Sequence, residues 1–551
     1  MEIQIVQISS LEKVRTGDKL NHEEIHNKAV LAGERLSYQI CMRTDCRMDA
    51  NLSVESEFGS NVRLYLVKDA CMDLPAREKD MEGEDYITLE PGMMPDILIP
   101  LEETKGHVAL TNQVSTVWVK VDIPKDAEPG YYEVKVKIEP DAAGDISLSL
   151  CERMGIQVIS AAMPEQKLIY TRWFYADCIA VQHHVEIYSE EHWALIDKYI
   201  AAAADVGINM ILVPIHTPPL DTEVGTARPC VQLVDIEKNG DQYTFSFQRF
   251  RRFIDICKKN GIRYFEMAHM FSQWGAKCAP NIMVTENGVK SYLFGWHVAA
   301  DSEEYVSFLK QYIRAISGEL EREGISEQTY FHISDEPSAD SMDTYRIASD
   351  IMRPLIGDSR NFDALSDYGF YENGLVSCPV TSVTHIHEFL EHAIPDQWAY
   401  YCCHPEKVFT NCFLAMPSAR TRVLGFLLYK YDIKGFLHWG FNFYNSSVSR
   451  YPVNPWLTTS GDCSYPSGDP FIVYPGRDCV YPSVRGEVTY EAVQDMDICF
   501  VLERYIGREA VVAMIDQAAG RDLRFDDYPK GKEFLEGLRA KMVERIRECC
   551  A

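Results

Sequence analysis

The sequence predicts an α/β protein in which an N-terminal β-sandwich precedes a (β/α)8 barrel and a C-terminal helical segment follows it. Two observations carry this prediction. Short alternating segments fill the first 160 residues, and eight apolar strand-like runs then alternate with helical patterns between about 168 and 445. A chain of 551 residues exceeds what one core usually supports, so we expect several domains. We place them at 1–163, 164–485 and 486–551.

The first domain shows the period-two pattern of half-buried strands. Val117 to Val121 and Tyr132 to Ile138 alternate apolar with other residues, and turn residues such as Glu128-Pro129-Gly130 separate such runs. Few helical periods interrupt them, as is typical of a β-sandwich. Ser160 to Pro164 is a plausible linker into a region with a different rhythm.

The second domain repeats a strand followed by a helix, which is typical of a barrel of parallel strands. The eight strand-like runs are Leu168 to Phe174, Asn209 to Ile215, Tyr264 to Met270, Tyr330 to Asp335, Phe362 to Ser366, Ser382 to Ile386, Trp398 to Cys402 and Gly435 to Phe443. Helical patterns between them include Glu191 to Val206, Phe250 to Asn260, Ser302 to Arg322, Asp340 to Leu355 and Ser418 to Tyr431.

The run from Phe331 to Pro337 ends on two adjacent carboxylates, Asp335 and Glu336. A buried strand has little use for bare charge, so this pair is better placed at a cleft, where two carboxylates can share acid and base work. The alternative is that Ser334 and Asp335 only start the helix whose pattern follows from Ser338, because Ser and Asp cap helices and Pro is favoured in the first turn.

Polar and aromatic residues also accumulate at the other strand ends, where barrel enzymes carry their sites. Aromatic planes beside carboxylates suit a sugar, whose C–H faces stack on rings while its hydroxyls need fixed acceptors. For any single Trp or Tyr, plain packing is the alternative. The expected substrate-binding residues are Trp173, His216, Asp221, Trp274, Asp367, Tyr401, His438, Trp439, Asn442 and Tyr444.

The formal net charge of -28 argues against a nucleic-acid partner, because phosphate binding needs clusters of Lys and Arg. No window holds about 18 uncharged apolar residues, and the amino terminus lacks a basic region followed by a long apolar one. We therefore expect neither a membrane partner nor an export signal.

The 17 cysteines are odd in number, include the adjacent pairs Cys402-Cys403 and Cys549-Cys550, and form no CxxC pair. This usage suits a reducing compartment, so we expect a cytoplasmic protein. His183-His184 and His385-Ile386-His387 lack companion ligands at metal spacing. We expect no metal and no cofactor.

The region after 445 begins with a long loop rich in Tyr, Pro, Ser and Gly, from Tyr451 to Tyr481. It either folds over the barrel mouth or is simply pinned down by Trp456 and Tyr465. Lys530 to Cys550 then shows the amphipathic spacing of a packed helix.

Several separated motifs together resemble the catalytic-domain group of glycoside hydrolase family 123, the β-N-acetylgalactosaminidases with a β-sandwich ahead of a (β/α)8 barrel. The resemblance runs from about 165 to 510. The motifs are Trp173 to Cys178, Gly207 to Leu212 with Pro218 to Thr222, Gln273 to Lys277, His332 to Pro337, Gly435 to Gly440, and a closing Arg485-Gly486-Glu487 with Asp495.

The resemblance implies that Asp335 and Glu336 are the catalytic pair of a retaining, exo-acting enzyme in which the 2-acetamido oxygen of the substrate is the nucleophile. Glu336 would then be the acid and base, and Asp335 would hold the acetamide N–H. The implied partner is a β-linked N-acetylgalactosamine oligosaccharide or glycoconjugate. A glycosidase for another amino sugar or for a sugar without an acetamide, and a non-catalytic carbohydrate-binding protein, are the alternatives. The oligomeric state does not follow from the sequence.

Overall fold

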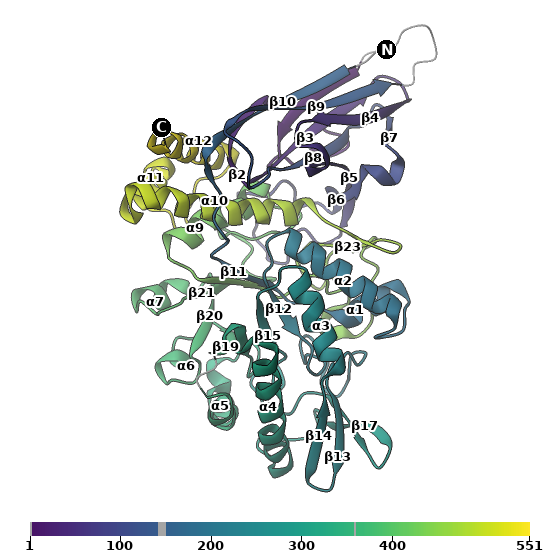
Figure 1. The fold of residues 1–551 in the computed structure, drawn as a ribbon, viewed down its shortest axis with the longest axis vertical. Coiled ribbons are helices and arrows are strands. Elements are labelled where there is room, and N and C mark those ends of the chain that lie inside the picture. Colours follow the sequence, from purple (N-terminus) through teal and green to yellow (C-terminus); the bar gives the residue numbers. More distant parts are fainter. Residues whose placement is uncertain (1–2, 141–149, 358–359, 551) are drawn as a thin grey trace.

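A computed structural model describes residues 3–140, 150–357 and 360–550 (Figure 1). Eight parallel strands close into a barrel in chain order, which confirms the predicted (β/α)8 architecture. The strands are β11 (Ile169–Arg172), β12 (Met210–Val213), β15 (Tyr264–Met267), β18 (Thr329–Phe331), β19 (Arg360–Leu365), β20 (Cys378–Ser382), β21 (Trp398–Tyr400) and β22 (Gly435–His438).

The sixth strand lies earlier in the chain than we predicted. Cys378–Ser382 forms β20, and the residues from Val383 onward turn into the short helix α7 (Ile386–Glu391) instead of continuing the strand. Pro379 lies inside β20, and proline is unusual in a central strand because it donates no ladder hydrogen bond. The sequence pattern therefore placed this strand at Ser382 to Ile386, starting where the true strand ends.

The predicted helices cover the outside of the barrel. They are α2 (Glu190–Asp205), α3 (Gln248–Lys259), α4 (Glu303–Glu323), α5 (Met342–Ile356), α8 (Ser418–Arg422) and α9 (Leu424–Lys430). Ser189 and Ser302 cap α2 and α4 by accepting the backbone N–H of the third helical residue, and Gly324 ends α4 in the left-handed conformation that glycine adopts readily.

The long loops after β12 and β15 carry a small sheet of their own. The hairpin of β13 (Asp235–Asn239) and β14 (Gln242–Ser246) pairs with the hairpin of β16 (Ile282–Glu286) and β17 (Val289–Phe294). The sheet lies at the foot of the view in Figure 1. These two loops are therefore ordered extensions of the barrel.

The N-terminal region is a β-sandwich, as predicted. One five-stranded sheet runs β1-β3-β8-β5-β6 and the other runs β2-β10-β9-β4-β7. The strands are β1 (Ile3–Ser9), β2 (Asn27–Ala32), β3 (Arg35–Thr44), β4 (Met48–Ser56), β5 (Val62–Met72), β6 (Gly92–Pro100), β7 (His107–Leu110), β8 (Ser115–Asp122), β9 (Gly130–Pro140) and β10 (Leu150–Ala162).

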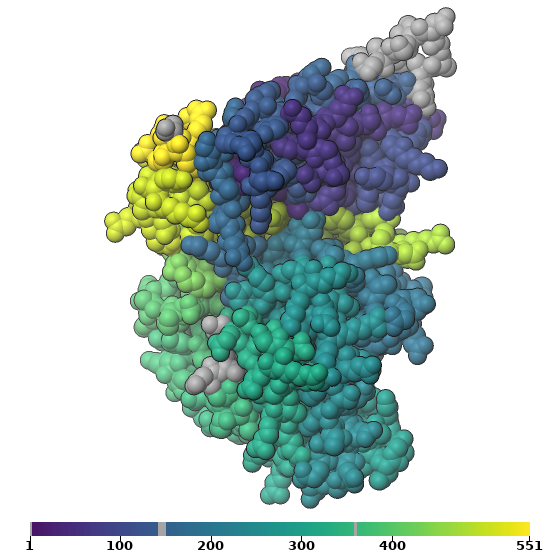
Figure 2. All heavy atoms as spheres, viewed as in Figure 1, coloured from purple at the N-terminus to yellow at the C-terminus, as the bar shows by residue number. Residues whose placement is uncertain are grey.

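The C-terminal segment is helical, with α10 (Val484–Ile506), α11 (Arg508–Ala519) and α12 (Lys532–Cys550). Figure 2 shows this segment lying against both the sandwich and the barrel. Residues 485 and 486 lie in the first turn of α10, so the boundary that we expected there falls inside a helix. None of the described helices has the length and apolar character that crossing a bilayer requires.

The closing motif of the family resemblance joins these parts. Arg485 pairs with Asp96 of β6 at 2.9 Å, and Glu487 pairs with Lys120 of β8 at 2.8 Å. Asp495 pairs with Arg422 of α8 at 2.7 Å. All six side chains are at most one-tenth exposed. Helix α10 therefore connects the sandwich and the barrel through buried ion pairs.

Candidate active site

A cavity opens where the barrel strands end, and both carboxylates of the predicted pair line it. It is small, about 130 Å³. Its walls are aromatic and its polar groups are mainly carboxyls and thiols. The lining residues are Trp173, Tyr175, Leu220, Asp221, Trp274, Asp335, Glu336, Ala364, Tyr400, Cys402, Cys403, Leu437, Trp439 and Tyr465.

The turn after β18 delivers Asp335 and Glu336 to this cavity. Asp363 of β19 accepts hydrogen bonds from the backbone N–H groups of Ile333 (3.1 Å) and Ser334 (3.3 Å), which fixes the chain just before the pair. Ser338 begins the following helical turn and forms a reciprocal capping box with Ser341. The helix cap is thus Ser338, and Asp335 and Glu336 are free of that role.

Three residues of the cavity have a left-handed backbone without being glycine. The φ angles are +38° at Glu336, +39° at Asp221 and +57° at Trp274. Each follows a different barrel strand, and the backbone N–H of Trp274 donates to the carbonyl of Asp335 at 2.9 Å. Such backbone strain costs about 1 to 3 kcal/mol per residue and clusters at functional sites.

The two carboxyls of the pair have different surroundings. Burial, and then the charge of Glu336, raises the pKa of Asp335 well above its ordinary value, while the charge of His332 opposes this rise. Glu336 accepts a hydrogen bond from the hydroxyl of Tyr400 at 2.6 Å. A raised pKa on one carboxyl, beside a second carboxyl held by a tyrosine hydroxyl, gives the two groups the unequal surroundings that paired acid and base chemistry requires.

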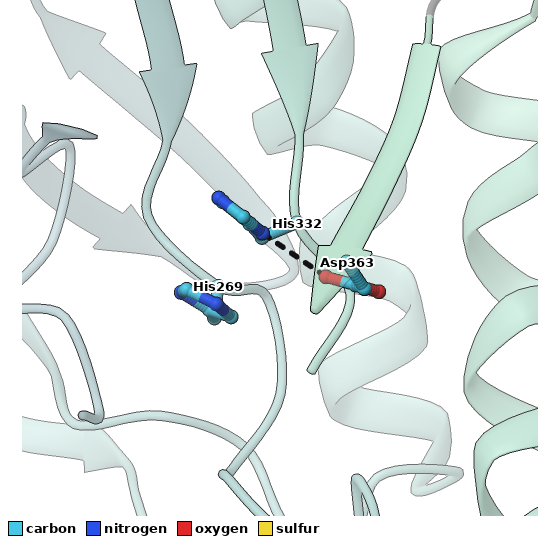
Figure 3. Close-up of side chains that lie close together, drawn as sticks. All are labelled: His269, His332 and Asp363. Atoms are coloured by element: carbon cyan, nitrogen blue, oxygen red, sulfur yellow. Dashed lines mark hydrogen bonds and ion pairs between the residues drawn. The ribbon is translucent and has the colours of Figure 1, made fainter. Parts of the chain in front are cut away.

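A buried cluster of two histidines and an aspartate, His269, His332 and Asp363, lies near the ends of neighbouring barrel strands (Figure 3). His332 contacts Glu266 through Nε2 at 2.9 Å and Asp363 through Nδ1 at 3.1 Å. Burial lowers the pKa of His332, but the hydrogen bonds and charges of these carboxylates outweigh it and raise that pKa to about 9. His269 stacks on the His332 ring with centroids 3.9 Å apart, and its own pKa lies well below the ordinary value because it is buried beside His332.

The donor set of this cluster resembles a metal site, since His269, His332 and Asp363 place ligand atoms within 4.8 Å of one another. The hydrogen bonding does not fit that use. Both ring nitrogens of His332 are directed at carboxylates, so neither offers a free lone pair to an ion. The cluster is an imidazolium held by two carboxylates.

The loop that follows β22 closes one side of the cavity. Tyr465 donates its hydroxyl to Asp221, and the backbone N–H of Val448 donates to the same carboxylate at 3.1 Å. Trp439 donates its indole N–H to Asp469 at 2.9 Å and contacts the Tyr465 ring. The loop therefore folds over the barrel mouth, while its Trp456 is bound further along, to the carbonyl of Pro475.

The model of the catalytic domain of glycoside hydrolase family 123 matches residues 173–502, well over half of the chain. The chain belongs to glycoside hydrolase family 123. This membership makes the protein a glycoside hydrolase. Among curated proteins, none matches the sequence.

A solved structure supports the same architecture for this family 123 hydrolase. A family 123 glycoside hydrolase from Clostridium perfringens, described for the hydrolysis of glycolipid glycans, superposes with a TM-score of 0.74 at 16% identity, covering 100% of this chain and 97% of that chain. A family 5 mannosidase from Rhizomucor miehei matches with a TM-score of only 0.32 at 11% identity, covering 63% of this chain and 95% of that chain. At 16% identity the match to the Clostridium perfringens enzyme shows the fold. The mannosidase superposes too poorly to add to it.

Six of the twelve expected site residues of the hydrolase line the cavity: Trp173, Asp221, Trp274, Asp335, Glu336 and Trp439. Trp173 donates its indole N–H to Glu266 at 3.1 Å. Because this hydrogen bond uses the N–H, Trp173 presents its ring to the cavity. Trp274 is half exposed at the mouth. These residues come from five different strand ends, as the barrel prediction required.

The other six lie around the cavity without lining it. Asn442 binds the backbone of Tyr175, and Tyr444 donates to the carbonyl of Val473. Asp367 caps a turn through the N–H of Gly369. His216 is buried against the carbonyl of His269, His438 accepts the N–H of Gly440, and Tyr401 packs on Phe436.

Several lining residues of the hydrolase were not singled out by the sequence reasoning. Tyr400 was passed over for its neighbour Tyr401, although adjacent residues point to opposite sides and either could have faced the cavity. Tyr175 and Tyr465 belonged to segments already marked, the first strand end and the long loop. Glu266 does not line the cavity but is buried against Trp173 and His332. Its one signal in the sequence was a carboxylate inside an otherwise apolar strand.

Proposed function

We propose that this family 123 hydrolase releases terminal N-acetylgalactosamine from β-linked glycans with retention of configuration, by substrate-assisted catalysis through an oxazoline intermediate. One observation carries the proposal: Asp335 and Glu336 are consecutive residues of one turn and line the same small cavity. The description of the Clostridium perfringens enzyme, glycolipid glycan hydrolysis, supports the substrate class.

Consecutive carboxyls suit a substrate that supplies its own nucleophile. An ordinary retaining glycosidase needs a carboxylate about 5 to 5.5 Å from the acid, on the opposite face of the sugar, and substrate-assisted enzymes are the exception. In the proposed reaction the acetamide oxygen attacks the anomeric carbon as the bond to the leaving oxygen breaks. Glu336 gives its proton to that oxygen.

Asp335 accepts the acetamide N–H and stabilises the positive oxazolinium that forms. In the second step Glu336 removes a proton from water, the water oxygen bonds to the anomeric carbon, and the acetamide is restored. Burial raises the pKa of Asp335 in the free enzyme. A hydrogen bond from the acetamide N–H favours the ionised form of Asp335, so substrate binding opposes this rise and leaves Asp335 as the acceptor that the first step uses.

The shape and walls of the cavity support an exo-acting enzyme for one terminal sugar. Its volume of about 130 Å³ is below the roughly 300 to 1,000 Å³ of common ligand sites. Trp173, Tyr175 and Trp439 offer ring faces, and Asp221 offers a carboxylate fixed by Tyr465. Rings and a fixed acceptor are what a sugar ring with hydroxyl groups requires.

A panel of nitrophenyl β-glycosides tests the proposal. We expect hydrolysis of the N-acetylgalactosaminide and failure on the plain galactoside, because the mechanism needs the acetamide. Faster hydrolysis of the N-acetylglucosaminide would show that the substrate is another amino sugar and not N-acetylgalactosamine. Equal rates on the galactoside would reject the substrate-assisted mechanism.

A galacto-configured thiazoline, which mimics the bicyclic intermediate, tests the mechanism separately. It should inhibit more tightly than N-acetylgalactosamine, by roughly 10²-fold or more, because enzymes bind intermediate-like states better than ground states. If it binds no better than the free sugar while the galactosaminide is still cleaved, Asp221 becomes the candidate for an ordinary covalent nucleophile.

We also propose that the protein works in a reducing compartment such as the cytoplasm. All 17 cysteines lie in the described part of the chain and are free thiols. Thiol counting under denaturing conditions, on protein purified from its source, is the test. Two or more stable disulfides whose reduction abolishes activity would reject the cytoplasmic proposal.

A further inference from the structure

Two cysteines of the cavity wall have no part in the proposed mechanism. Cys402 and Cys403 lie just after β21, separated from it by Tyr401, and line the cavity together with Asp335 and Glu336. Both are partly exposed, unlike the buried Cys178, Cys257 and Cys499. A small reagent that enters the sugar cavity therefore meets two thiols.

The surroundings of the two thiols make them unequal. The thiol of Cys402 donates to the carbonyl of His404 at 3.6 Å. Its contact with the neighbouring sulfur, and then the guanidinium of Arg77, lower the pKa of Cys403 against the effect of burial. The same contact raises the pKa of Cys402 well above its ordinary value. Thiolate is the reactive form of cysteine, so Cys403 is the nucleophile of the pair.

Arg77 reaches this position from the sandwich. It lies on the connection between β5 and β6, where its backbone N–H donates to Glu406 at 2.8 Å and the N–H of Glu78 donates to the same carboxylate at 3.2 Å. Glu406 lies three residues beyond Cys403 in the loop after β21. The connection is thus bound to the loop that carries the thiols, which holds the cation beside Cys403.

We propose that Cys403 is a site of reversible S-thiolation by low-molecular-weight disulfides, and that the adduct blocks the sugar cavity beside Glu336. The thiolate of Cys403 attacks one sulfur of the disulfide, a new S–S bond forms as the old one breaks, and the leaving thiolate takes a proton from solvent. One protein thiol and one disulfide give one mixed disulfide and one small thiol.

Cys402 assists this reaction rather than closing a ring with Cys403. Neighbouring Cα atoms are about 3.8 Å apart, below the roughly 4.4 Å at which disulfides usually begin. A bond between the two sulfurs would be strained and readily reduced. The mixed disulfide is therefore the product that accumulates, and an added thiol reverses it.

Oxidised glutathione is the probe, applied to the full-length protein under native conditions. Peptide mass mapping should place one glutathionyl group on Cys403, hydrolysis of the best aryl glycoside from the panel should fall as the adduct forms, and dithiothreitol should restore both. Labelling does not depend on which sugar the enzyme cleaves, whereas the loss of hydrolysis rests on the proposed function, so the two failures are distinguishable.

Matched variants test whether Cys403 is the modified thiol. Each variant is assayed before and after treatment with oxidised glutathione. Cys403→Ser should lose the label and the sensitivity, and Cys402→Ser should be labelled more slowly. Cys463→Ser, which removes an exposed thiol outside the cavity, should respond like wild type. Bound N-acetylgalactosamine should protect Cys403. A label that maps elsewhere, or a Cys403→Ser variant that is inhibited as strongly as wild type, would overturn the proposal.

Discussion

The imidazole of His332 directs Nε2 at the carboxylate of Glu266, at 2.9 Å, and both side chains are fully buried. The opposite nitrogen meets Asp363, which also holds the backbone leading to Asp335. His332 is thus a buried cation that acts on Asp335, one of the three carboxyls of the cavity. Its charge favours the ionised form of Asp335.

We predict that His332→Gln lowers kcat/KM by roughly 10² to 10³, the loss expected when one preorganised electrostatic group is removed. The variant leaves Glu266 and Asp363 without their cation, so a loss of unfolding free energy of about 3 to 5 kcal/mol should accompany it. Steady-state kinetics and urea titration measure the two effects. His183→Gln, outside the cavity, is the control and should change neither.

The pH dependence of the wild type gives a second test of His332. Its pKa is raised to about 9, so the stabilisation from its charge is fully present below the ordinary value near 6.5 and is lost as pH rises through about 9. We expect stability and kcat/KM to decline over that interval, and the decline to be absent from the stability of His332→Gln. An unchanged alkaline profile in the variant would contradict the assignment.

The fold was readable from the sequence because its signals are local. Alternation and helical periodicity along the chain located all eight barrel strands, apart from the shift at β20, where Pro379 masked the strand. The small sheet of β13, β14, β16 and β17 was missed because it is formed by two loops that are separate in the sequence. Pairing between distant segments leaves no periodic signal.

The candidate site was predictable only in part, because contacts between distant segments leave no local signal in the sequence. Strand-end position found Asp335, Glu336 and the tryptophans, but it could not choose between Tyr400 and Tyr401. The hydrogen bond from Tyr400 to Glu336 spans 64 positions of the chain. The thiol pair appeared in the sequence as evidence about a compartment, and only the structure places it in the cavity wall.

Tyr400→Phe should lower kcat/KM by about 10- to 100-fold, because hydrogen bonds to charged groups contribute about 1.5 to 3 kcal/mol and this hydroxyl fixes Glu336. Tyr401→Phe removes a hydroxyl one residue away that does not line the cavity, and it should keep near wild-type kinetics. A comparable loss in both variants would show that packing, rather than the contact with Glu336, explains the effect.

The ion pair between Arg485 and Asp96 is predicted to govern the stability of the junction between sandwich and barrel. Arg485→Met removes the cation beside the buried Asp96, which keeps the Tyr474 hydroxyl and a backbone N–H as donors, and it should cost about 3 to 5 kcal/mol of unfolding free energy. The double variant Arg485→Met with Asp96→Asn should recover part of that loss, since it removes the unpaired charge. Urea titration followed by circular dichroism measures both; equal stability of Arg485→Met and wild type would contradict the prediction.

In the proposed reaction Asp335 and Glu336 have different roles, and two isosteric variants separate them. Glu336→Gln should slow substrates with poor leaving groups much more than activated aryl glycosides, because only the former need a proton as the bond breaks. Asp335→Asn should lower both by a comparable factor, on the order of 10² to 10³, because charge stabilisation of the oxazolinium is lost for either leaving group. The assay is kcat/KM on a nitrophenyl glycoside and on a disaccharide, with folding checked by circular dichroism.

Azide distinguishes this scheme from a covalent glycosyl-enzyme. In the substrate-assisted reaction Asp335 never bonds to the sugar, so azide should not restore Asp335→Asn, and Asp221→Gly is the matched test for the third carboxylate of the cavity. Rescue of either variant with formation of an α-glycosyl azide would make that residue an ordinary nucleophile, because azide then occupies the space of the missing carboxylate. If folded Asp335→Asn and Glu336→Gln both keep wild-type rates, hydrolysis does not depend on these two carboxyls.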